Sequence, residues 1–186
     1  NITLENININ PTRSGFLIAL ERMGANINIF NQKNIAGEIV ADINVKSSEL
    51  NGCELDEQMA KLMIDEFPIL SIAASQANSP SYFKGLDELR IKESDRLELI
   101  NDNLNRCGYY SKIKDNDLFI DPKKNKPIIN STIRTDFDHR IAMSFAVLGS
   151  KIGKLQINES DSINTSFPSF KEQFNRAGGN LIWKKL

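Results

Sequence analysis

Three stretches of the chain share one pattern, and this repetition limits the folds that the sequence can adopt. Each stretch starts as an amphipathic helix, ends that helix at a glycine and continues as a β-rich run. The stretches begin at Arg13, Ser94 and Ser166. Their closing glycines are Gly24, Gly108 and Gly178. The chain therefore repeats one supersecondary unit.

Further elements are expected between these stretches. They are strands at 39–47, 117–122, 126–134 and 154–160, a further strand between the helix at 67–77 and the charged segment 89–96, and second helices at 67–77 and 139–149. The order helix, strand, strand, helix, strand thus occurs twice and begins a third time. Alternating helices and strands in a repeat of this length predict an α/β domain of packed pseudo-symmetric units. The third copy ends without its second half, so we expect either a truncated domain or completion by a segment from elsewhere in a longer chain.

The composition excludes several classes of protein. The 186 residues carry a formal net charge of -1 with acids and bases interspersed, which argues against a nucleic-acid-binding surface. Cys53 and Cys107 have no metal-binding or disulfide-framework spacing, so a reducing cytoplasm is the expected location. No signal peptide and no apolar run of membrane-spanning length is visible. The first residue is Asn rather than Met, which suggests a piece of a longer protein.

Start signals of the predicted helices are clear in the sequence. Proline in a first turn and a short polar residue before it mark such starts. We expect helix starts at Asn10-Pro11, at Pro68 and at Ser166 with Pro168, and we expect Ser94 and Asp138 to cap two more helices. The helix after Asp138 is predicted to end at Gly149.

Charged residues gather at these helix starts. Acids complement the positive end of the helix dipole, whereas Arg96 and Arg140 stand in first turns where the dipole disfavours them. A bound anion would reverse that penalty. If the repeats bring the helix starts together, they form an anion-binding face with carboxylates among cations. The residues concerned are Arg13, Asp65, Glu66, Lys92, Glu93, Arg96, Asp138, His139 and Arg140.

Each of these residues also has a plain structural interpretation. Lys92, Glu93, Asp95 and Arg96 could form solvated surface pairs of little energetic value. The lone histidine, His139, has no partner visible in the sequence. Asp65 could simply cap the helix at Pro68. It is the recurrence of charge at several helix starts that favours a site.

Five segments of the sequence resemble one enzyme family. They are "INPTRSG", "MIDEFPIL", "LRIKESDRL", "TDFDHRIAMSFAV" and "INTSFPSF". Together they resemble the C-terminal portion of the 5-enolpyruvylshikimate-3-phosphate synthases, which are 3-phosphoshikimate 1-carboxyvinyltransferases. The resemblance runs from the first residues to about Gly178. The residues of these motifs are more similar to those of the glyphosate-tolerant bacterial branch than to those of the plant type.

The resemblance implies a fold and a domain assignment. The family has two domains, each made of three βαβαββ units around a pseudo-threefold axis, with the substrates bound between them. Residues 1–186 would then be the C-terminal domain, in incomplete form, with the N-terminal domain as its missing partner. In the family a short N-terminal segment joins the C-terminal domain, which would account for the incomplete third unit. We expect the full-length protein to be a monomer.

The resemblance also implies an activity. The family transfers the enolpyruvyl group of phosphoenolpyruvate to the 5-hydroxyl of shikimate 3-phosphate and releases phosphate, as a step of aromatic amino acid biosynthesis. The reaction needs no metal and no organic cofactor. The isolated chain is expected to be inactive and to bind phosphoenolpyruvate weakly, although its cations could still capture sulfate or phosphate from a buffer.

Roles for seven residues follow from the resemblance. Asp65 would be the base at the 5-hydroxyl, and Glu93 would take part in proton transfer at the methylene carbon. Lys92 would reach the junction of the two substrates, and Arg96 and Arg140 would hold phosphoenolpyruvate, since guanidinium groups suit carboxylate and phosphate. The two other residues expected to adjust this arginine pair are Asp138 and His139.

One position departs from the family pattern. Many members carry a lysine just before the helix start at "SFP", where this sequence has Thr165. A phosphate-contacting cation is therefore absent at that position, and another residue must supply its charge or the branch does without it.

Two alternatives stay open at the level of sequence. One is the sister enolpyruvyl transferase that acts on UDP-N-acetylglucosamine, which shares the repeat but lacks the paired "KESDR" and "DHR" motifs. The other is a non-catalytic anion-binding domain that kept the fold. In a complete enzyme, replacement of Asp65 or Glu93 by Ala would cause severe loss of turnover, whereas a binding domain could lose either residue without consequence.

Overall fold

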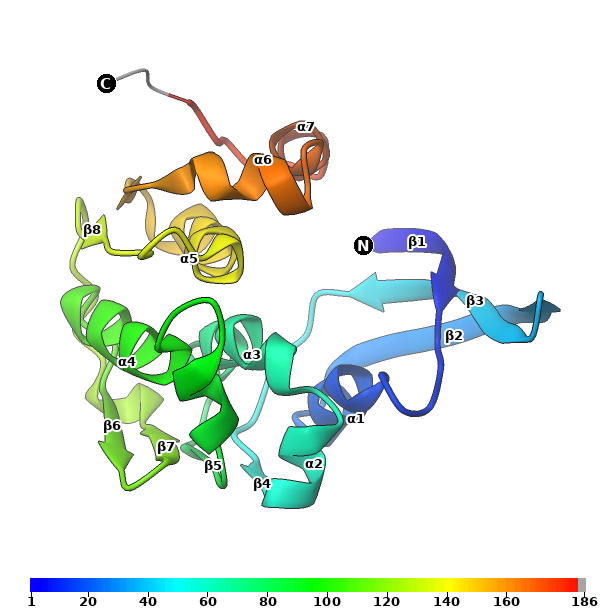
Figure 1. Ribbon diagram of the computed structural model, residues 1–186, viewed down its shortest axis with the longest axis horizontal. Helices are drawn as coiled ribbons and strands as arrows, with labels where there is room; N and C mark the ends of the chain where they lie inside the picture. The colour runs from blue at the N-terminus through cyan, green and yellow to red at the C-terminus, as the bar shows by residue number, and fades with distance from the viewer. Residues whose placement is uncertain (184–186) are drawn as a thin grey trace.

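A computed structural model describes residues 1–183, in which helices and strands alternate around three small sheets (Figure 1). The predicted domain was 1–186, so its last three residues lie outside the described part. No helix within residues 1–183 is both long enough and apolar enough to cross a membrane.

The middle of the chain forms one complete βαβαββ unit. Its sheet has the order β4-β5-β7-β6, with β4 parallel to β5 and the other pairs antiparallel. A short helix α2 (Glu57–Lys61) and a 3-10 turn η1 (Ile64–Glu66) lie between the first strand and the first long helix. The unit consists of β4 (Glu54–Leu55), α3 (Phe67–Ser75), β5 (Ser81–Phe83), α4 (Arg96–Arg106), β6 (Ser111–Lys114) and β7 (Asp117–Ile120).

Parts of two further units flank this complete one. The first part corresponds to β5, α4, β6 and β7, and its sheet has the order β1-β3-β2 with antiparallel pairs. The last part corresponds to β4, α3, β5 and α4, and its two strands are parallel, as β4 and β5 are. The first part consists of β1 (Ile2–Asn8), α1 (Gly15–Arg22), β2 (Asn26–Ile35) and β3 (Glu38–Lys46). The last consists of β8 (Thr132–Ile133), α5 (His139–Ile152), β9 (Gln156–Ile157), a short α6 (Ile163–Ser166) and α7 (Phe170–Arg176).

This correspondence confirms the predicted α/β fold with a pseudo-threefold repeat of βαβαββ units in one incomplete domain. The unit begins with a strand, however, and not with the helix from which the sequence pattern was counted. Within residues 1–183 the first unit therefore lacks its opening strand and helix, and the third unit lacks its last two strands.

Helices α3 and α5 pack against each other and carry much of the core. The sequence of α3, FPILSIAAS, is apolar except for Ser71 and Ser75, and both serines are buried with most of the helix. Phe67 packs edge to face against Phe83 of β5, with their ring centroids 5.5 Å apart. Ile141 and Phe145 of α5 are fully buried. Because the starts of α3, α4 and α5 are tied to this core, the residues at those starts are held in place.

Two apolar surfaces of this core are open within the described residues. A groove of about 790 Å³ runs between α1, α3 and α5, lined by residues that include Phe16, Leu20, Ile69, Ile72 and Val147. Strand β1 pairs with β3 alone, and its Ile2 and Leu4 are exposed. Strand β5, which occupies the equivalent position, pairs on both of its edges.

Several helix ends differ from the sequence-based expectations. Residues 11–13 form a turn, and α1 begins only at Gly15. Asp95 rather than Ser94 caps α4, by accepting a hydrogen bond from the Glu98 N–H. The Ser94 hydroxyl instead donates to Asp138.

The later elements also have different bounds. Helix α5 continues through Gly149 and ends before Gly153, whose φ of 94° places it in the left-handed region. The helix expected from Ser166 begins at Phe170, after the separate short helix α6. The strand expected over 126–134 is reduced to Thr132–Ile133.

Candidate active site

Arg96 joins three of the predicted carboxylates in one cluster. It is the first residue of α4, and its side chain is 1% exposed. Its Nε donates to Asp138 Oδ2 at 2.7 Å and its Nη1 to Asp65 Oδ1 at 2.9 Å, while its Nη2 binds the Glu93 carboxylate. A guanidinium group is planar and has five donors, so it can hold several carboxylates at once.

Asp138 lies beneath Arg96 and is wholly buried. The carboxylate caps α5 by accepting from the N–H groups of Arg140 and Ile141, as the sequence predicted, and it accepts from the Ser94 hydroxyl at 2.9 Å. Burial alone would raise the pKa of this carboxyl group. The hydrogen bond and charge of Arg96, with the bonds from Ser94 and the Arg140 N–H, outweigh burial and hold the pKa below its ordinary value.

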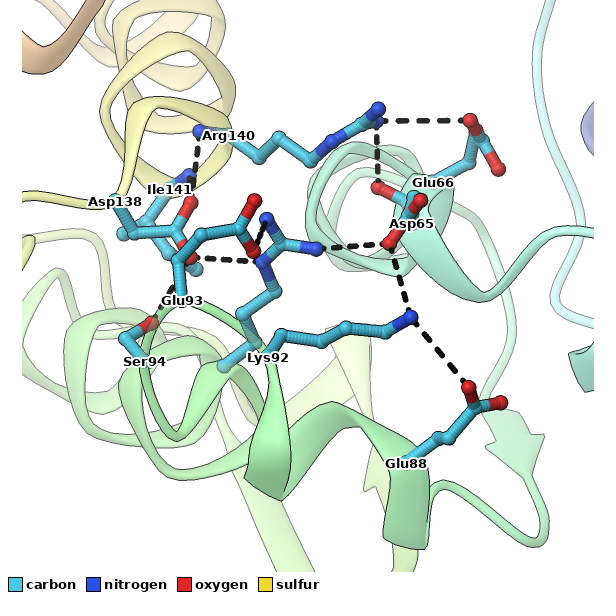
Figure 2. A network of polar contacts seen from close by, with 10 residues as sticks. Asp65, Glu66, Glu88, Lys92, Glu93, Ser94, Asp138, Arg140 and Ile141 are labelled. Atoms are coloured by element: carbon cyan, nitrogen blue, oxygen red, sulfur yellow. Dashed lines mark hydrogen bonds and ion pairs between the residues drawn. The ribbon is translucent and has the colours of Figure 1, made fainter.

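Asp65 receives two cationic side chains. It lies in η1, directly before α3, and in addition to Arg96 it has Lys92 Nζ at 3.6 Å from its Oδ1 (Figure 2). Its side chain makes no hydrogen bond to the start of α3, so the structural interpretation of Asp65 as a helix cap is wrong. The carboxylate is instead part of the charged cluster.

Arg140 reaches from the start of α5 across to η1 (Figure 2). Its Nη1 donates to the backbone carbonyl of Asp65 at 2.9 Å and lies 3.5 Å from Glu66 Oε1. Lys92 likewise has a second carboxylate, since its Nζ is 3.5 Å from Glu88 Oε1. Both cations are partly exposed, unlike Arg96, and both can reach a ligand by exchanging a carboxylate partner.

The structure thus gathers six of the seven predicted site residues into one network. The exception is His139, the half-buried first residue of α5, which makes none of the hydrogen bonds or ion pairs that connect the cluster within residues 1–183. The six gathered residues are Asp65, Lys92, Glu93, Arg96, Asp138 and Arg140. Their functional roles stay predictions.

Sequence reasoning gave no individual role in the site to three residues of this network. Glu88 stands four residues before Lys92, a spacing that pairs side chains on a helical turn and could have revealed it. Glu66 was counted in the expected anion-binding face without a role of its own, and Ser94 was expected to be a cap. Nothing local in the sequence indicated that the partners of Glu66 and Ser94 would be Arg140 and Asp138, at the start of α5.

Charge is unevenly balanced in the cluster, because five carboxylates surround three cationic side chains. The arrangement brings two accessible carboxylates, Asp65 and Glu93, to either side of one guanidinium group. Such a pair can exchange protons with a bound molecule, and the cations can hold its anionic groups. The carboxylates are Asp65, Glu66, Glu88, Glu93 and Asp138, and the cations are Lys92, Arg96 and Arg140.

No charge is present at position 165, where the resemblance predicts a lysine. Thr165 lies in α6 and is exposed, and its hydroxyl donates to the Ser162 carbonyl at 2.8 Å. Within residues 1–183, no three His, Cys, Asp or Glu side chains are arranged to hold a metal ion.

Comparison with known proteins identifies the family. Residues 1–174 match the family model described as EPSP synthase (3-phosphoshikimate 1-carboxyvinyltransferase). The chain belongs to the EPSP synthase family. This membership agrees with the resemblance of its motifs and decides against the sister transferase as its family.

Individual relatives agree with this assignment. The 3-phosphoshikimate 1-carboxyvinyltransferase of Ruthia magnifica subsp. Calyptogena magnifica is 39% identical over 183 residues, which are 97% of this chain and 42% of the relative. That of Paramagnetospirillum magneticum is 40% identical over 181 residues, with 97% and 41% covered. The chain therefore spans about two fifths of the length of these EPSP synthases.

Solved structures show the same fold. An EPSP synthase from Acinetobacter baumannii superimposes with a TM-score of 0.89 at 37% identity, over 94% of this chain and 41% of that one. The enolpyruvyl transferase NikO from Streptomyces tendae superimposes with a TM-score of 0.64 at 17% identity, over 96% of this chain and 38% of that one. The second likeness concerns the fold alone.

Proposed function

We propose that this chain is part of an enzyme that transfers the enolpyruvyl group of phosphoenolpyruvate to the 5-hydroxyl of shikimate 3-phosphate and releases phosphate. Membership of the EPSP synthase family supports this activity. The single observation that carries it is the contact of Arg96 with both Asp65 and Glu93. That contact puts the two carboxylates proposed for proton transfer into one cluster with the cations that anionic substrates require.

The two carboxylates take complementary parts in the proposed reaction. Asp65 accepts the proton of the 5-hydroxyl as its oxygen attacks the donor, and Glu93 delivers a proton to the methylene carbon. A proton of the new methyl group returns to the Glu93 carboxylate as phosphate leaves the tetrahedral intermediate, which restores the carbon–carbon double bond and completes the transfer. Glu93, with 54% of its side chain exposed, is free to approach a substrate, and positioned acids and bases of this kind typically accelerate a reaction by about 10² to 10⁴.

The cations differ in what they need in order to bind a substrate. Lys92 and Arg140 are partly exposed and exchange one carboxylate each for an anionic group. Arg96 is enclosed by carboxylates and reaches phosphoenolpyruvate only if Glu93 releases it. Asp138 acts on the substrates only through Arg96, which it orients. His139 is the next residue, at the start of α5.

We further propose that residues 1–186 are the C-terminal domain and that the rest of the family's length completes it. The complete middle unit is the template for this proposal. A strand beside β1 would stand where β4 stands beside β5, and a helix in the groove between α1, α3 and α5 would take the place that α3 holds in its own unit. Apolar side chains line part of the groove, and Ile2 and Leu4 are exposed on β1, which suits burial of both surfaces.

The N-terminal domain would then form the second wall of the site. A full-length monomer in the cytoplasm is part of the same proposal, and the two free thiols, Cys53 and Cys107, suit a reducing compartment.

The test is phosphate release from phosphoenolpyruvate by the complete protein, with the remaining part of the family chain restored. Shikimate 3-phosphate and UDP-N-acetylglucosamine are offered in parallel. We expect release with shikimate 3-phosphate only, and severe loss of turnover in the Asp65→Ala and Glu93→Ala variants.

Other outcomes of this assay contradict the proposal in distinct ways. Release with the sugar nucleotide alone would assign the sister activity, and release with neither acceptor would favour a non-catalytic anion-binding domain. Turnover by the isolated 186-residue protein would contradict the two-walled site.

A further inference from the structure

Glu66 belongs to the charged cluster but has no part in the proposed reaction. It occupies the N-cap position of α3, where a carboxylate commonly accepts hydrogen bonds from the first N–H groups of the helix. Its side chain makes no such bond. Figure 2 shows the carboxylate turned toward the end of the Arg140 side chain, with Glu66 Oε1 3.5 Å from Arg140 Nη1.

An anion beside Arg140 stabilises its charge in the absence of substrate. It stands in the first turn of α5, where the helix dipole disfavours a cation, and the N–H groups of this turn are already occupied by Asp138. Its Nη1 makes a strong hydrogen bond to the Asp65 carbonyl, but that group is neutral. Glu66 supplies the negative charge.

We infer that Glu66 is a positioning residue that holds Arg140 in the ligand-free protein and competes with the anionic group of the substrate for it. The inference rests on the proposed function, in which Arg140 binds the anionic donor. Binding of a phosphate or carboxylate group at Arg140 displaces Glu66, while the bond from Arg140 to the Asp65 carbonyl can persist. Glu66 thereby lowers the affinity of the site for anions and keeps the arginine extended toward η1.

The strength of this competition follows from exposure. Both side chains are 32% exposed, and ion pairs of this kind stabilise a protein only weakly. Removing the charge of Glu66 should therefore tighten anion binding by about two- to fivefold and no more. Glu66→Gln keeps the size of the side chain, and Glu66→Asp keeps the charge but withdraws it by one methylene group.

The test is a calorimetric titration of inorganic phosphate into the 186-residue protein, which measures the affinity for phosphate. Glu66→Gln should tighten binding about two- to fivefold, and Glu66→Asp should have a smaller effect in the same direction. The matched control is Glu57→Gln, because Glu57 is also an exposed acid with one basic partner, Lys61 at 3.1 Å, and lies outside the cluster. This control should bind phosphate as the unmodified protein does.

A double variant separates competition for Arg140 from a general effect of charge. In an Arg140→Gln background, addition of Glu66→Gln should produce no tightening, and complete loss of phosphate binding in that background would equally support Arg140 as the receptor. The inference is overturned if Glu57→Gln and Glu66→Gln act alike, if the tightening persists without Arg140, if Glu66→Gln weakens binding, or if the unmodified protein binds no phosphate.

This experiment involves no enolpyruvyl chemistry, so its result is independent of the activity assay. In the complete enzyme the same inference predicts that Glu66→Gln lowers KM for phosphoenolpyruvate more than it changes kcat. The complete protein could show no enolpyruvyl transfer while the phosphate titrations behave as expected. In that case the proposed function fails and the role of Glu66 stands.

Discussion

Arg96 and Asp138 form the structural base of the site. Both side chains are withdrawn from solvent, and loss of Arg96 would leave Asp138 as a buried charge without its cation. Asp138 also caps α5, and Arg96 also holds Asp65 and Glu93, so this pair connects the starts of α4 and α5 with η1. At the scale of single residues, the positions of the proposed acid and base depend on this buried pair.

Replacement of Arg96 should therefore destabilise the protein strongly. We expect Arg96→Met to lower the free energy of unfolding by roughly 3 to 5 kcal/mol, because Asp138 would stay buried without its cation. Urea denaturation measures the loss. Arg106→Met is the matched control, since Arg106 pairs with Asp102 at the surface and its loss should cost less than about 1 kcal/mol. Equal losses in the two variants would contradict the prediction.

Acid should remove the contribution of Asp138. The pKa of this carboxyl is lower in the folded protein than its ordinary value of 3.8, so the unfolded chain binds the proton more readily. The stabilisation is fully present above that ordinary value and is lost as the pH falls through the lower folded pKa. We expect the difference in unfolding free energy between the unmodified protein and Asp138→Asn to be constant near neutrality and to narrow below about pH 4. A difference that widens on acidification, in urea titrations at successive pH values, would refute this assignment.

At the scale of elements, three equivalent glycines end the first long helix of each stretch of the repeat. Gly24, Gly108 and Gly178 all have φ values in the left-handed region, between 76° and 100°, as their repeated position suggested. Their surroundings differ. A Cβ atom on Gly108 would lie 1.9 Å from the Lys126 carbonyl oxygen, whereas one on Gly178 would meet nothing within 4 Å.

This difference predicts unequal effects of the same substitution. Gly178→Ala should cost about 1 kcal/mol of unfolding free energy, the strain of a left-handed alanine. Gly108→Ala adds a backbone clash and should cost at least about twice as much. Thermal or urea unfolding of the two variants compares them directly, and a Gly178→Ala variant as unstable as Gly108→Ala would show that the backbone conformation alone decides.

At the scale of the whole molecule, the described residues contain one complete unit and two partial ones. In the proposed complete protein, the opening strand and helix of the first unit cover the free edge of β1 and the open groove. An exposed apolar strand edge is a site for pairing with another strand, and in the proposed complete protein this edge is covered.

Hydrogen exchange tests this proposal. The amides of β1 that do not pair with β3 should exchange rapidly in the 186-residue protein and become protected in the complete protein. Amides of β5, which is paired on both edges here, should keep the same protection in both and serve as the internal control. Unchanged exchange in β1 would exclude a strand at this edge.

Much of the fold and part of the site could be predicted from the sequence. Amphipathic period, glycine and proline signals are local, so α1, α3, α4 and α5 were expected close to where they lie. The cap at Asp138 was predicted for the same reason. Of the expected strand over 126–134, only Thr132–Ile133 formed, and these are the two residues of the run that pair with β9. Ser94 failed as a cap because α4 begins one residue later than expected, at Arg96, so that Asp95 takes the N-cap position.

The repeat, the element types and the concentration of charge at helix starts were thus determined by the sequence itself, since each depends on neighbours within a few turns of chain. Only the tertiary structure decided which charges meet. Packing of α3 against α5 brings Asp65 and Glu66 to Arg140, and the position of α4 beside them brings Arg96 to Asp65 and Asp138. The physical reason is that such pairs join residues far apart in the chain. Their side chains meet only when the helices have packed and their starts lie next to one another.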